Sequence, residues 1–169
     1  MAKAMLDIFD LCRENRVLHA HAVEILAREG ITQFVQIGSS FPLKERNTYT
    51  IAQGIDPDTR VVYVDPDPLI TEYAKGLLKR DISTTVICGD IRVPDTVFGN
   101  HKLTDLIDFS KPVSILIMLD ACFFADKEIQ KVMRAIRTAM LPGSYIAITH
   151  ETSDRNPWNA SATNDVVNI

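Results

Sequence analysis

Apolar and polar positions follow two different periods along this chain, which predict helices and strands in turn. Five short apolar runs predict strands at Gln33–Ile37, Arg60–Val64, Thr84–Cys88, Val113–Leu119 and Ser144–Thr149. Apolar residues at helical spacing predict helices at Arg13–Arg28, at Asn47–Gly54, from Pro68 and from Asp126, with two short helical pieces around His101–Ile107. Strands that alternate with helices in this way are typical of a parallel, doubly wound α/β sheet.

Capping residues and apolar stripes support the predicted helices. Gly30 lies where a left-handed C-terminal cap of the first helix would fall, and Asp67 can cap a helix that begins at Pro68. Asp126 is placed to cap the last helix. The predicted stripes are Val17, Leu18, Ala22, Ile25 and Leu26 in the first helix, and Leu69, Ile70, Tyr73, Ala74, Leu77 and Leu78 in the helix from Pro68.

The strand and helix pattern stops after the fifth strand. We therefore expect one α/β domain over residues 1–150 and a polar C-terminal tail over residues 151–169, rich in Asn, Ser, Thr and Asp. A chain of 169 residues is long enough to bury one hydrophobic core, and its 46% of apolar residues is ordinary for a globular protein.

Charge and cysteine usage narrow the classes of partner and compartment. A formal net charge of −4, with Lys and Arg scattered, argues against a nucleic-acid binder. Cys12, Cys88 and Cys122 are odd in number and far apart, which indicates free thiols in a reducing compartment. No signal peptide and no apolar run long enough to cross a bilayer are evident, so we expect a cytoplasmic protein.

The candidate chemistry lies where the predicted strands end, because ligands of open α/β sheets bind beyond the carboxyl ends of the strands. Glycine in the first turn would let the backbone approach a ligand, and the acid after the second strand could take the two hydroxyls of a ribose. These features predict a crevice for a nucleoside. The five strand ends carry Gly38-Ser39-Ser40, Asp65, Asp90, Asp120-Ala121-Cys122 and His150.

Each of these residues also has a purely structural interpretation. Gly38 could simply end its strand, and Asp65 could be a turn residue beside Pro66. Asp90 could hold an adenine amino group or cap the turn before a proline. Cys122 could be a nucleophile or a buried apolar filler, and His150 could be a general base or a structural histidine. Of the residues at these five strand ends, the sequence favours Asp65 most strongly as a functional residue.

The order and spacing of these motifs resemble the S-adenosyl methyltransferase family of class I, Rossmann-like methyltransferases, over nearly the whole chain up to His150. The matching motifs are Asn15-Arg16, Gly30–Phe34, Ile37-Gly38, Phe41-Pro42, Val61–Pro68, Asp90-Ile91-Arg92-x-Pro94 and Leu141–Tyr145.

The resemblance implies a role for several matching positions. Ile37 to Ser40, including Gly38, Ser39 and Ser40, would lie alongside the methionine part of S-adenosylmethionine, and Gln36 is a further cofactor-binding candidate. Asp65 would bind the ribose, and Asp90 and Ile91 would frame the adenine. The segment from Leu119 to Phe124 would line the methyl-transfer side. Methyl transfer is an in-line displacement that depends on positioning, so few catalytic side chains are required, and Cys122 and His150 are the catalytic candidates.

The sequence also departs from the pattern of that family. Members generally have an acid at the position of Gln36, a glycine at that of Ser40, and a histidine at that of Cys122. The family also continues for two further strands, whereas the pattern here ends with an unpaired sheet edge, which proteins normally cover. We therefore expect a second protein chain to cover that edge.

Three functions remain open from the sequence. The first is an S-adenosylmethionine-dependent, methyltransferase-like subunit that acts on a small molecule in a biosynthetic pathway. The second is a subunit that has lost methyl transfer and, with a partner, forms a pocket for an elimination or ring closure. The third is an NAD-type dinucleotide enzyme, because Asp65 would bind the ribose of NAD equally well. Against it, the chain keeps only the first glycine of the phosphate-binding fingerprint. No metal site is expected.

Overall fold

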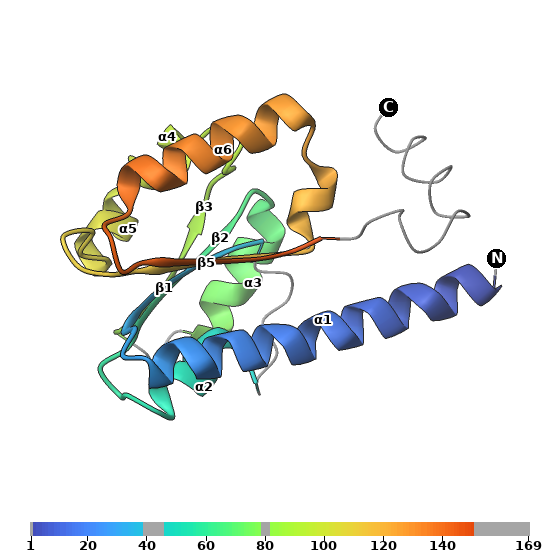
Figure 1. The fold of residues 1–169 in the computed structure, drawn as a ribbon, viewed down its shortest axis with the longest axis horizontal. Coiled ribbons are helices and arrows are strands. Elements are labelled where there is room, and N and C mark those ends of the chain that lie inside the picture. Colours follow the sequence, from blue (N-terminus) through green and yellow to red (C-terminus); the bar gives the residue numbers. More distant parts are fainter. Residues whose placement is uncertain (1, 39–45, 79–81, 151–169) are drawn as a thin grey trace.

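The fold is a parallel sheet with helices on both faces (Figure 1). The computed structural model describes residues 2–38, 46–78 and 82–150, with side chains from residue 9 onward. The strands are β1 (Gln33–Ile37), β2 (Arg60–Asp65), β3 (Thr84–Cys88), β4 (Ser114–Met118) and β5 (Tyr145–Thr149). The helices are α1 (Ala2–Arg28), α2 (Thr48–Gln53), α3 (Pro68–Leu78), α4 (Asp95–Phe98), α5 (His101–Leu106) and α6 (Asp126–Ala139), with a 3-10 turn, η1 (Asp120–Phe123).

The five strands run in the order β3-β2-β1-β4-β5, and all four neighbouring pairs are parallel. The chain therefore reverses direction of winding beside β1, whose Ile37 is in register with Val64 of β2 and with Ile117 of β4. This is the switch point at which ligands bind in open α/β sheets. The predicted doubly wound α/β class is confirmed.

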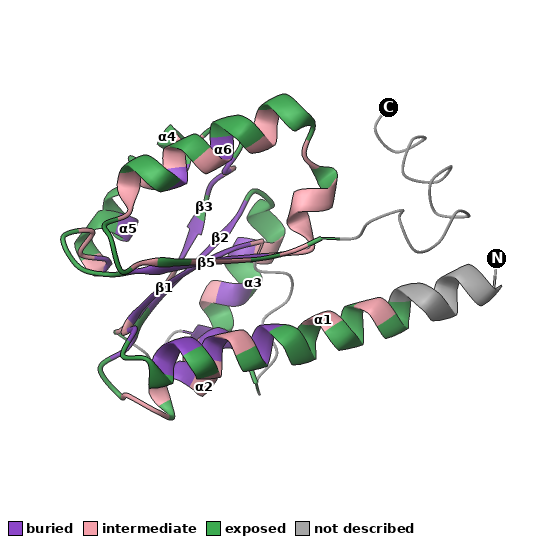
Figure 2. Ribbon diagram, in the orientation of Figure 1, coloured by how far each residue is buried: buried purple, intermediate pink, exposed green. Residues whose placement is uncertain are grey.

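Two hydrophobic layers enclose the sheet. One face packs against α1, α2 and α3 through residues such as Val23, Ala52 and Ala74, and the other packs against α4, α5 and α6 through residues such as Leu103 and Ile136. Strands covered on both faces should be apolar nearly throughout, as the sequence of the inner strands is. Figure 2 shows the resulting burial along β1, β2 and β3.

Most predicted elements are confirmed to within one or two residues, but several details were wrong. The first helix begins at Ala2 instead of Arg13. The stripe of α1 is correct only in part: Leu26 is buried as expected, and so are Ala20, Val23 and Ala27, whereas Leu18 and Ile25 are exposed. The small Ala20 and Ala27 thus share the buried face of this helix with Val23 and Leu26.

The predicted stripe of α3 is also only partly correct. Its residues Ala74 and Leu78 are buried as expected, but Thr71 is buried as well, and Leu69 is 81% exposed. Asp67 does cap α3, because its Oδ1 accepts a hydrogen bond from the Leu69 backbone N–H at 2.8 Å. For α6 the predicted cap was wrong. Ala125 precedes the helix, and Asp126 is its first residue.

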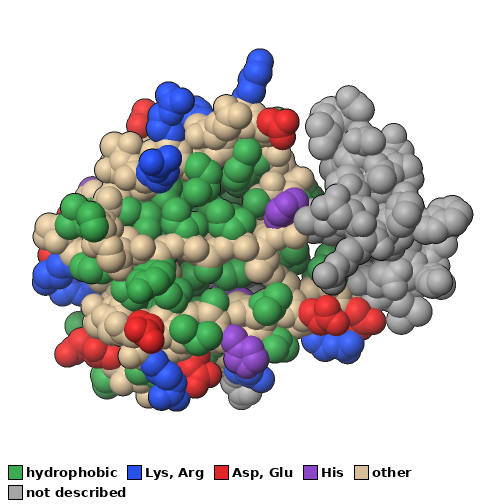
Figure 3. All heavy atoms as spheres, viewed as in Figure 1, with side chains coloured by type: hydrophobic (Ala, Val, Ile, Leu, Met, Phe, Trp, Pro, Cys, Tyr) green, Lys and Arg blue, Asp and Glu red, His purple; other side chains and the backbone are tan. Residues whose placement is uncertain are grey.

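The outer edge of β5 is open within the part of the chain that the structure describes. No described strand pairs with it, and Tyr145 and Ile148 are 45% and 39% exposed. The space-filling view shows apolar side chains gathered on the face that carries β5 and α6 (Figure 3). The predicted tail, residues 151–169, lies outside the described residues. No described helix combines the length and the apolar character that a membrane crossing requires.

Candidate functional site

The end of β1 is built around a glycine that no other residue could replace without strain. Gly38 has a φ of +71°, a conformation that L side chains rarely adopt, and its backbone N–H donates to the Val64 carbonyl oxygen at 2.9 Å. A Cβ at this position would overlap the carboxylate of Asp120. The glycine therefore gives room to an acid that comes from the neighbouring strand.

Asp120 owes its position to a left-handed residue directly after β4. Leu119 has a φ of +68°, uncommon for a residue with a branched side chain, and its backbone N–H donates to the Thr149 carbonyl oxygen at 3.0 Å. This turn directs the Asp120 carboxylate toward Gly38. Burial, followed by repulsion from Asp65, raises the pKa of Asp120 to about 6.

Asp65 ends β2 on the other side of Gly38 and is only 5% exposed. Its Oδ1 accepts a hydrogen bond from the Asp67 backbone N–H at 2.9 Å, and its carbonyl oxygen accepts from the Gly89 N–H at 3.0 Å. These bonds fix both the carboxylate and the start of the turn after β3. A buried carboxylate held at a strand end is suited to accept hydrogen bonds from ligand hydroxyls.

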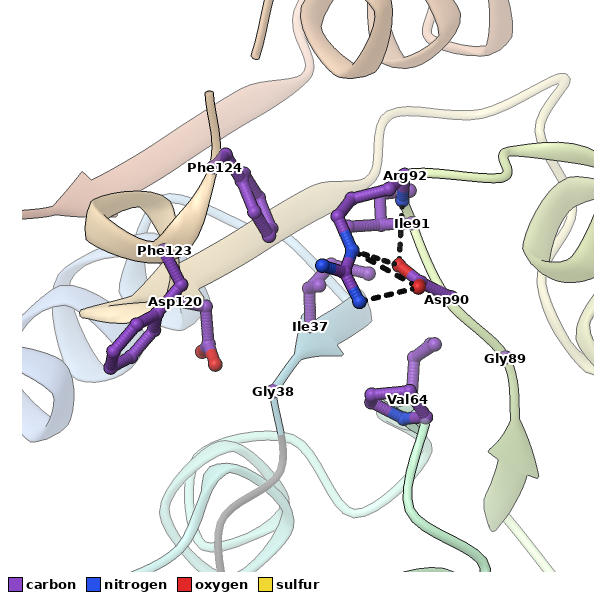
Figure 4. A pocket seen from close by; sticks show the side chains of 11 residues that line it. Ile37, Gly38, Val64, Gly89, Asp90, Ile91, Arg92, Asp120, Phe123 and Phe124 are labelled. Carbon is purple, nitrogen blue, oxygen red and sulfur yellow. Dashed lines mark hydrogen bonds and ion pairs between the residues drawn. The ribbon is translucent and has the colours of Figure 1, made fainter. Parts of the chain in front are cut away.

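Asp90, in the turn after β3, is held by an arginine two residues later. Arg92 Nε lies 3.0 Å from both carboxylate oxygens, and Arg92 Nη2 lies 2.8 Å from Oδ2 (Figure 4). Because the side-chain hydrogen bond to Arg92 stabilises the ionised form, the pKa of Asp90 is lowered. The neutralised pair closes one side of the site.

These strand ends surround a cavity of about 180 Å³. Figure 4 shows Phe124 and Ile37 near the Asp90–Arg92 pair, with Asp120 and Gly38 beside one another. Val64 and Ile91 add apolar surface to the lining. Ligand pockets commonly start at about 300 Å³, so the described residues form a partly open space for one part of a ligand, such as a planar base.

Gln36 does not line this cavity. Its side chain is 7% exposed and lies with Thr48 and His19 on the α1–α2 side of the sheet. The Thr48 hydroxyl donates to Gln36 Oε1 at 2.5 Å, and His19 Nε2 lies 2.8 Å from the same hydroxyl. Burial lowers the pKa of His19. Nothing in this network tests the predicted cofactor contact of Gln36, which stays a prediction.

The remaining predicted site residues divide as follows. Gly38, Asp90 and Ile91 line the cavity, and Asp65 lies beside it at the end of β2. Ser39 and Ser40 lie outside the described residues. The Cys122 thiol donates to the Leu119 carbonyl oxygen at 2.6 Å, and His150 is exposed after β5; neither lines the cavity. Their catalytic roles stay predictions.

Sequence reasoning missed the parts played by Asp120 and Arg92. Asp120 follows a predicted strand, which was the available signal, but the left-handed turn that directs it could not be inferred from a leucine. Arg92 had no signal beyond its place two residues after Asp90. Among the described residues no group of three or more His, Cys, Asp or Glu side chains could hold a metal ion.

The sheet order, the glycine turn at the switch point and the acids at the neighbouring strand ends define a Rossmann-like methyltransferase fold. A family model for S-adenosyl methyltransferases matches residues 1–168. The chain belongs to this S-adenosyl methyltransferase family, which confirms the resemblance seen in the sequence.

Solved structures agree with this assignment. The chain is similar to a putative methyltransferase from Thermobifida fusca YX, with 33% identity and a TM-score of 0.85 over 93% of this chain and 57% of that one. It is also similar to a DUF574 family protein from Streptomyces avermitilis MA-4680, with 30% identity and a TM-score of 0.83 over 91% of this chain and 60% of that one. The chain thus spans less than two thirds of these relatives.

A more distant likeness concerns the fold alone. The N-methyltransferase NodS from Bradyrhizobium japonicum WM9, crystallised with S-adenosyl-L-homocysteine, is 12% identical, with a TM-score of 0.58 over 94% of this chain and 74% of that one. No curated protein matches the chain.

The described residues fit the cofactor of this family. The Gly38 turn leaves backbone exposed beside the cavity, Asp65 presents a buried carboxylate at the end of β2, and Ile91 and Val64 give the cavity apolar walls. The methionine chain needs a close backbone approach, the ribose needs an acceptor for its hydroxyls, and the adenine needs an apolar slot.

Proposed function

We propose that this chain binds S-adenosylmethionine at the carboxyl ends of β1, β2 and β3 and takes part in methyl transfer to a small molecule. The observation that carries this proposal is the Gly38 turn between the buried Asp65 and the half-buried Asp120, in a chain of the S-adenosyl methyltransferase family. When bound, the cofactor would supply an electrophilic methyl group. The protein would mainly bind, orient and exclude water.

Three parts of the site have separate roles in this proposal. Asp65 accepts hydrogen bonds from the ribose hydroxyls. Ile91, together with Val64, frames the adenine, and Asp90 borders it. Gly38, which lines the cavity beside Asp120, borders the methionine chain. Because Arg92 already occupies both oxygens of Asp90, we expect the adenine to be held by apolar contact and backbone groups more than by that carboxylate.

An Asp65→Asn variant tests the ribose contact. Calorimetry with adenosine and with 2′-deoxyadenosine as probes should show that the wild-type chain prefers adenosine, and that the variant loses about 10-fold or more of this preference, because an ionised acceptor is replaced by an amide. Asp105→Asn, an exposed acid on α5, is a matched control that should change nothing. Equal discrimination by Asp65→Asn would contradict the assignment.

A subunit that binds the cofactor but no longer transfers methyl groups is the second candidate. It is favoured by the positions of Cys122 and His150, neither of which lines the cavity. Such a chain would contribute its pocket to an elimination or ring closure together with a partner. Radiolabelled S-adenosylmethionine offered with a panel of small nucleophiles separates the two, because only a methyltransferase releases labelled product and S-adenosylhomocysteine.

We further propose that a second polypeptide covers the open edge of β5 by adding a strand. The support is the absence of any described strand on that edge, together with the exposed apolar side chains of Tyr145 and Ile148. Unpaired strand edges with apolar side chains bind further strands readily. Light scattering after size exclusion should find an assembly larger than one chain, and Ile148→Lys should dissociate it. A stable wild-type monomer would exclude this partner.

A further inference from the structure

The charges at the cavity are unevenly balanced. Asp65 and Asp120 follow strands that flank β1 on either side, with Gly38 between them. The third acid of the cavity, Asp90, is paired with Arg92. By contrast, among the residues that the structure describes, no lysine, arginine or histidine forms an ion pair with Asp120.

The backbone keeps Asp120 in this place although the location is unfavourable for a carboxylate. Burial and a neighbouring like charge both oppose ionisation. Two uncommon backbone conformations place it there, at Leu119 and at Gly38, and the glycine also leaves the space that the carboxylate fills. Strained backbone and an acid that resists ionisation together are typical of ligand sites.

Gln36 cannot take over the role of a counter-charge. It is neutral, its Oε1 accepts the Thr48 hydroxyl, and its side chain lies on the α1–α2 side of the sheet instead of in the cavity. Asp90 is already neutralised, and it lies after β3, away from the β1–β4 side of the site. Asp120 is therefore the acid of the cavity lining that a cationic group could meet beside the Gly38 turn.

We infer that Asp120 is the counter-charge for the positively charged sulfonium and methionine end of S-adenosylmethionine. This inference rests on the proposed function. The cofactor carries its positive charges, a sulfonium and an ammonium, on the side of the ribose opposite the adenine. In the site, Asp120 lies across Gly38 from Asp65, on the side away from Asp90 and Ile91. The order of charges along the ligand then matches the order of groups across the sheet.

An Asp120→Asn variant of the full chain tests this assignment by calorimetry at pH 7.5. The probes are S-adenosylmethionine, S-adenosylhomocysteine, which lacks the sulfonium charge, and 5′-methylthioadenosine, which lacks both charges. We expect the variant to bind S-adenosylmethionine about 10- to 100-fold more weakly and 5′-methylthioadenosine nearly as well as the wild type. Asp126→Asn removes one exposed negative charge outside the cavity lining and is the matched control, for which we expect no change.

Each outcome bears on the inference. A loss confined to S-adenosylmethionine places the sulfonium at Asp120, and an equal loss for S-adenosylhomocysteine places the ammonium there; both support a cation at this acid. Unchanged binding of S-adenosylmethionine by Asp120→Asn, or an equal loss for 5′-methylthioadenosine, would overturn it while leaving the proposed function intact. If the wild-type chain bound none of the three probes, the proposed function would fail, and this inference with it. Circular dichroism of the variant confirms folding.

Discussion

Replacing Asp120 by asparagine should make the free protein more stable at neutral pH. The pKa of this carboxyl rises from 3.8 to about 6 on folding, because burial and Asp65 both oppose its charge. A rise of about two units corresponds to at most about 3 kcal/mol against folding once the group is ionised. Since the side chain keeps some access to solvent, we expect about 1–2 kcal/mol.

The size of this stabilisation depends on pH. Above about pH 7 the carboxyl is ionised in both the folded and the unfolded chain, and the full penalty applies. Between about pH 6 and pH 4 the folded chain holds a proton that the unfolded chain has released, so the wild type regains stability relative to the variant as the pH falls. The other acids at the site, Asp65 and the Arg92-paired Asp90, are unchanged in the comparison.

Urea unfolding of both chains at pH 7.5 and at pH 4.5 measures this difference. The stability gained by Asp120→Asn should be largest at pH 7.5 and should shrink toward zero at pH 4.5. Asp105→Asn, on the exposed face of α5, should show no such trend. A gain that is the same at both pH values, or a variant less stable at pH 7.5, would refute the argument that this carboxylate is held in an unfavourable place.

Three further predictions concern other parts of the structure. Gly38→Ala should destabilise the chain by about 1–3 kcal/mol in thermal or urea unfolding, since the alanine backbone would have to keep a positive φ and its Cβ would displace the Asp120 carboxylate. Unchanged stability would argue against the turn described. Thr48→Val keeps the shape of the side chain but removes the hydroxyl that donates a hydrogen bond to Gln36, so it should lower the stability by about 1–3 kcal/mol in the same assay. Thr48→Ser, which retains the hydroxyl, is the milder control. Arg92→Ala should raise the pKa of Asp90, measurable by NMR titration of its carboxyl, whereas no rise would mean that the pair does not persist in solution.

The sequence alone was enough to predict the sheet and the order of its elements. Buried strands need nearly continuous apolar runs, and the helices between them leave an apolar period and capping residues such as Asp67. These are local signals, and so they survive without any knowledge of contacts. The same holds for Asp65, because the residue after a strand of such a sheet lies at the ligand-binding edge in any register.

The packing of helix faces was beyond the reach of that reasoning. Leu18 and Leu69 have the spacing of core residues but are exposed, while Thr71 is buried. Which face of an amphipathic helix is covered depends on the distance at which it lies from the sheet, and small residues such as Ala74 set that distance. A hydrophobic pattern gives the period of a helix, but its rotation is decided by the surface against which it packs.

The sequence by itself thus determined the fold, the family motifs and the position of an acid at each of three strand ends. Only the tertiary structure decided what each acid does. It pairs Asp90 with Arg92, fixes Asp65 through the Asp67 backbone, and brings Asp120 against Gly38, a residue 82 positions earlier in the chain. The physical reason is that charge interactions depend on distance and on burial. For Asp90 and Asp65 both are set by the geometry of a turn, and for Asp120 by two strands that neighbour each other in the sheet but not in the sequence.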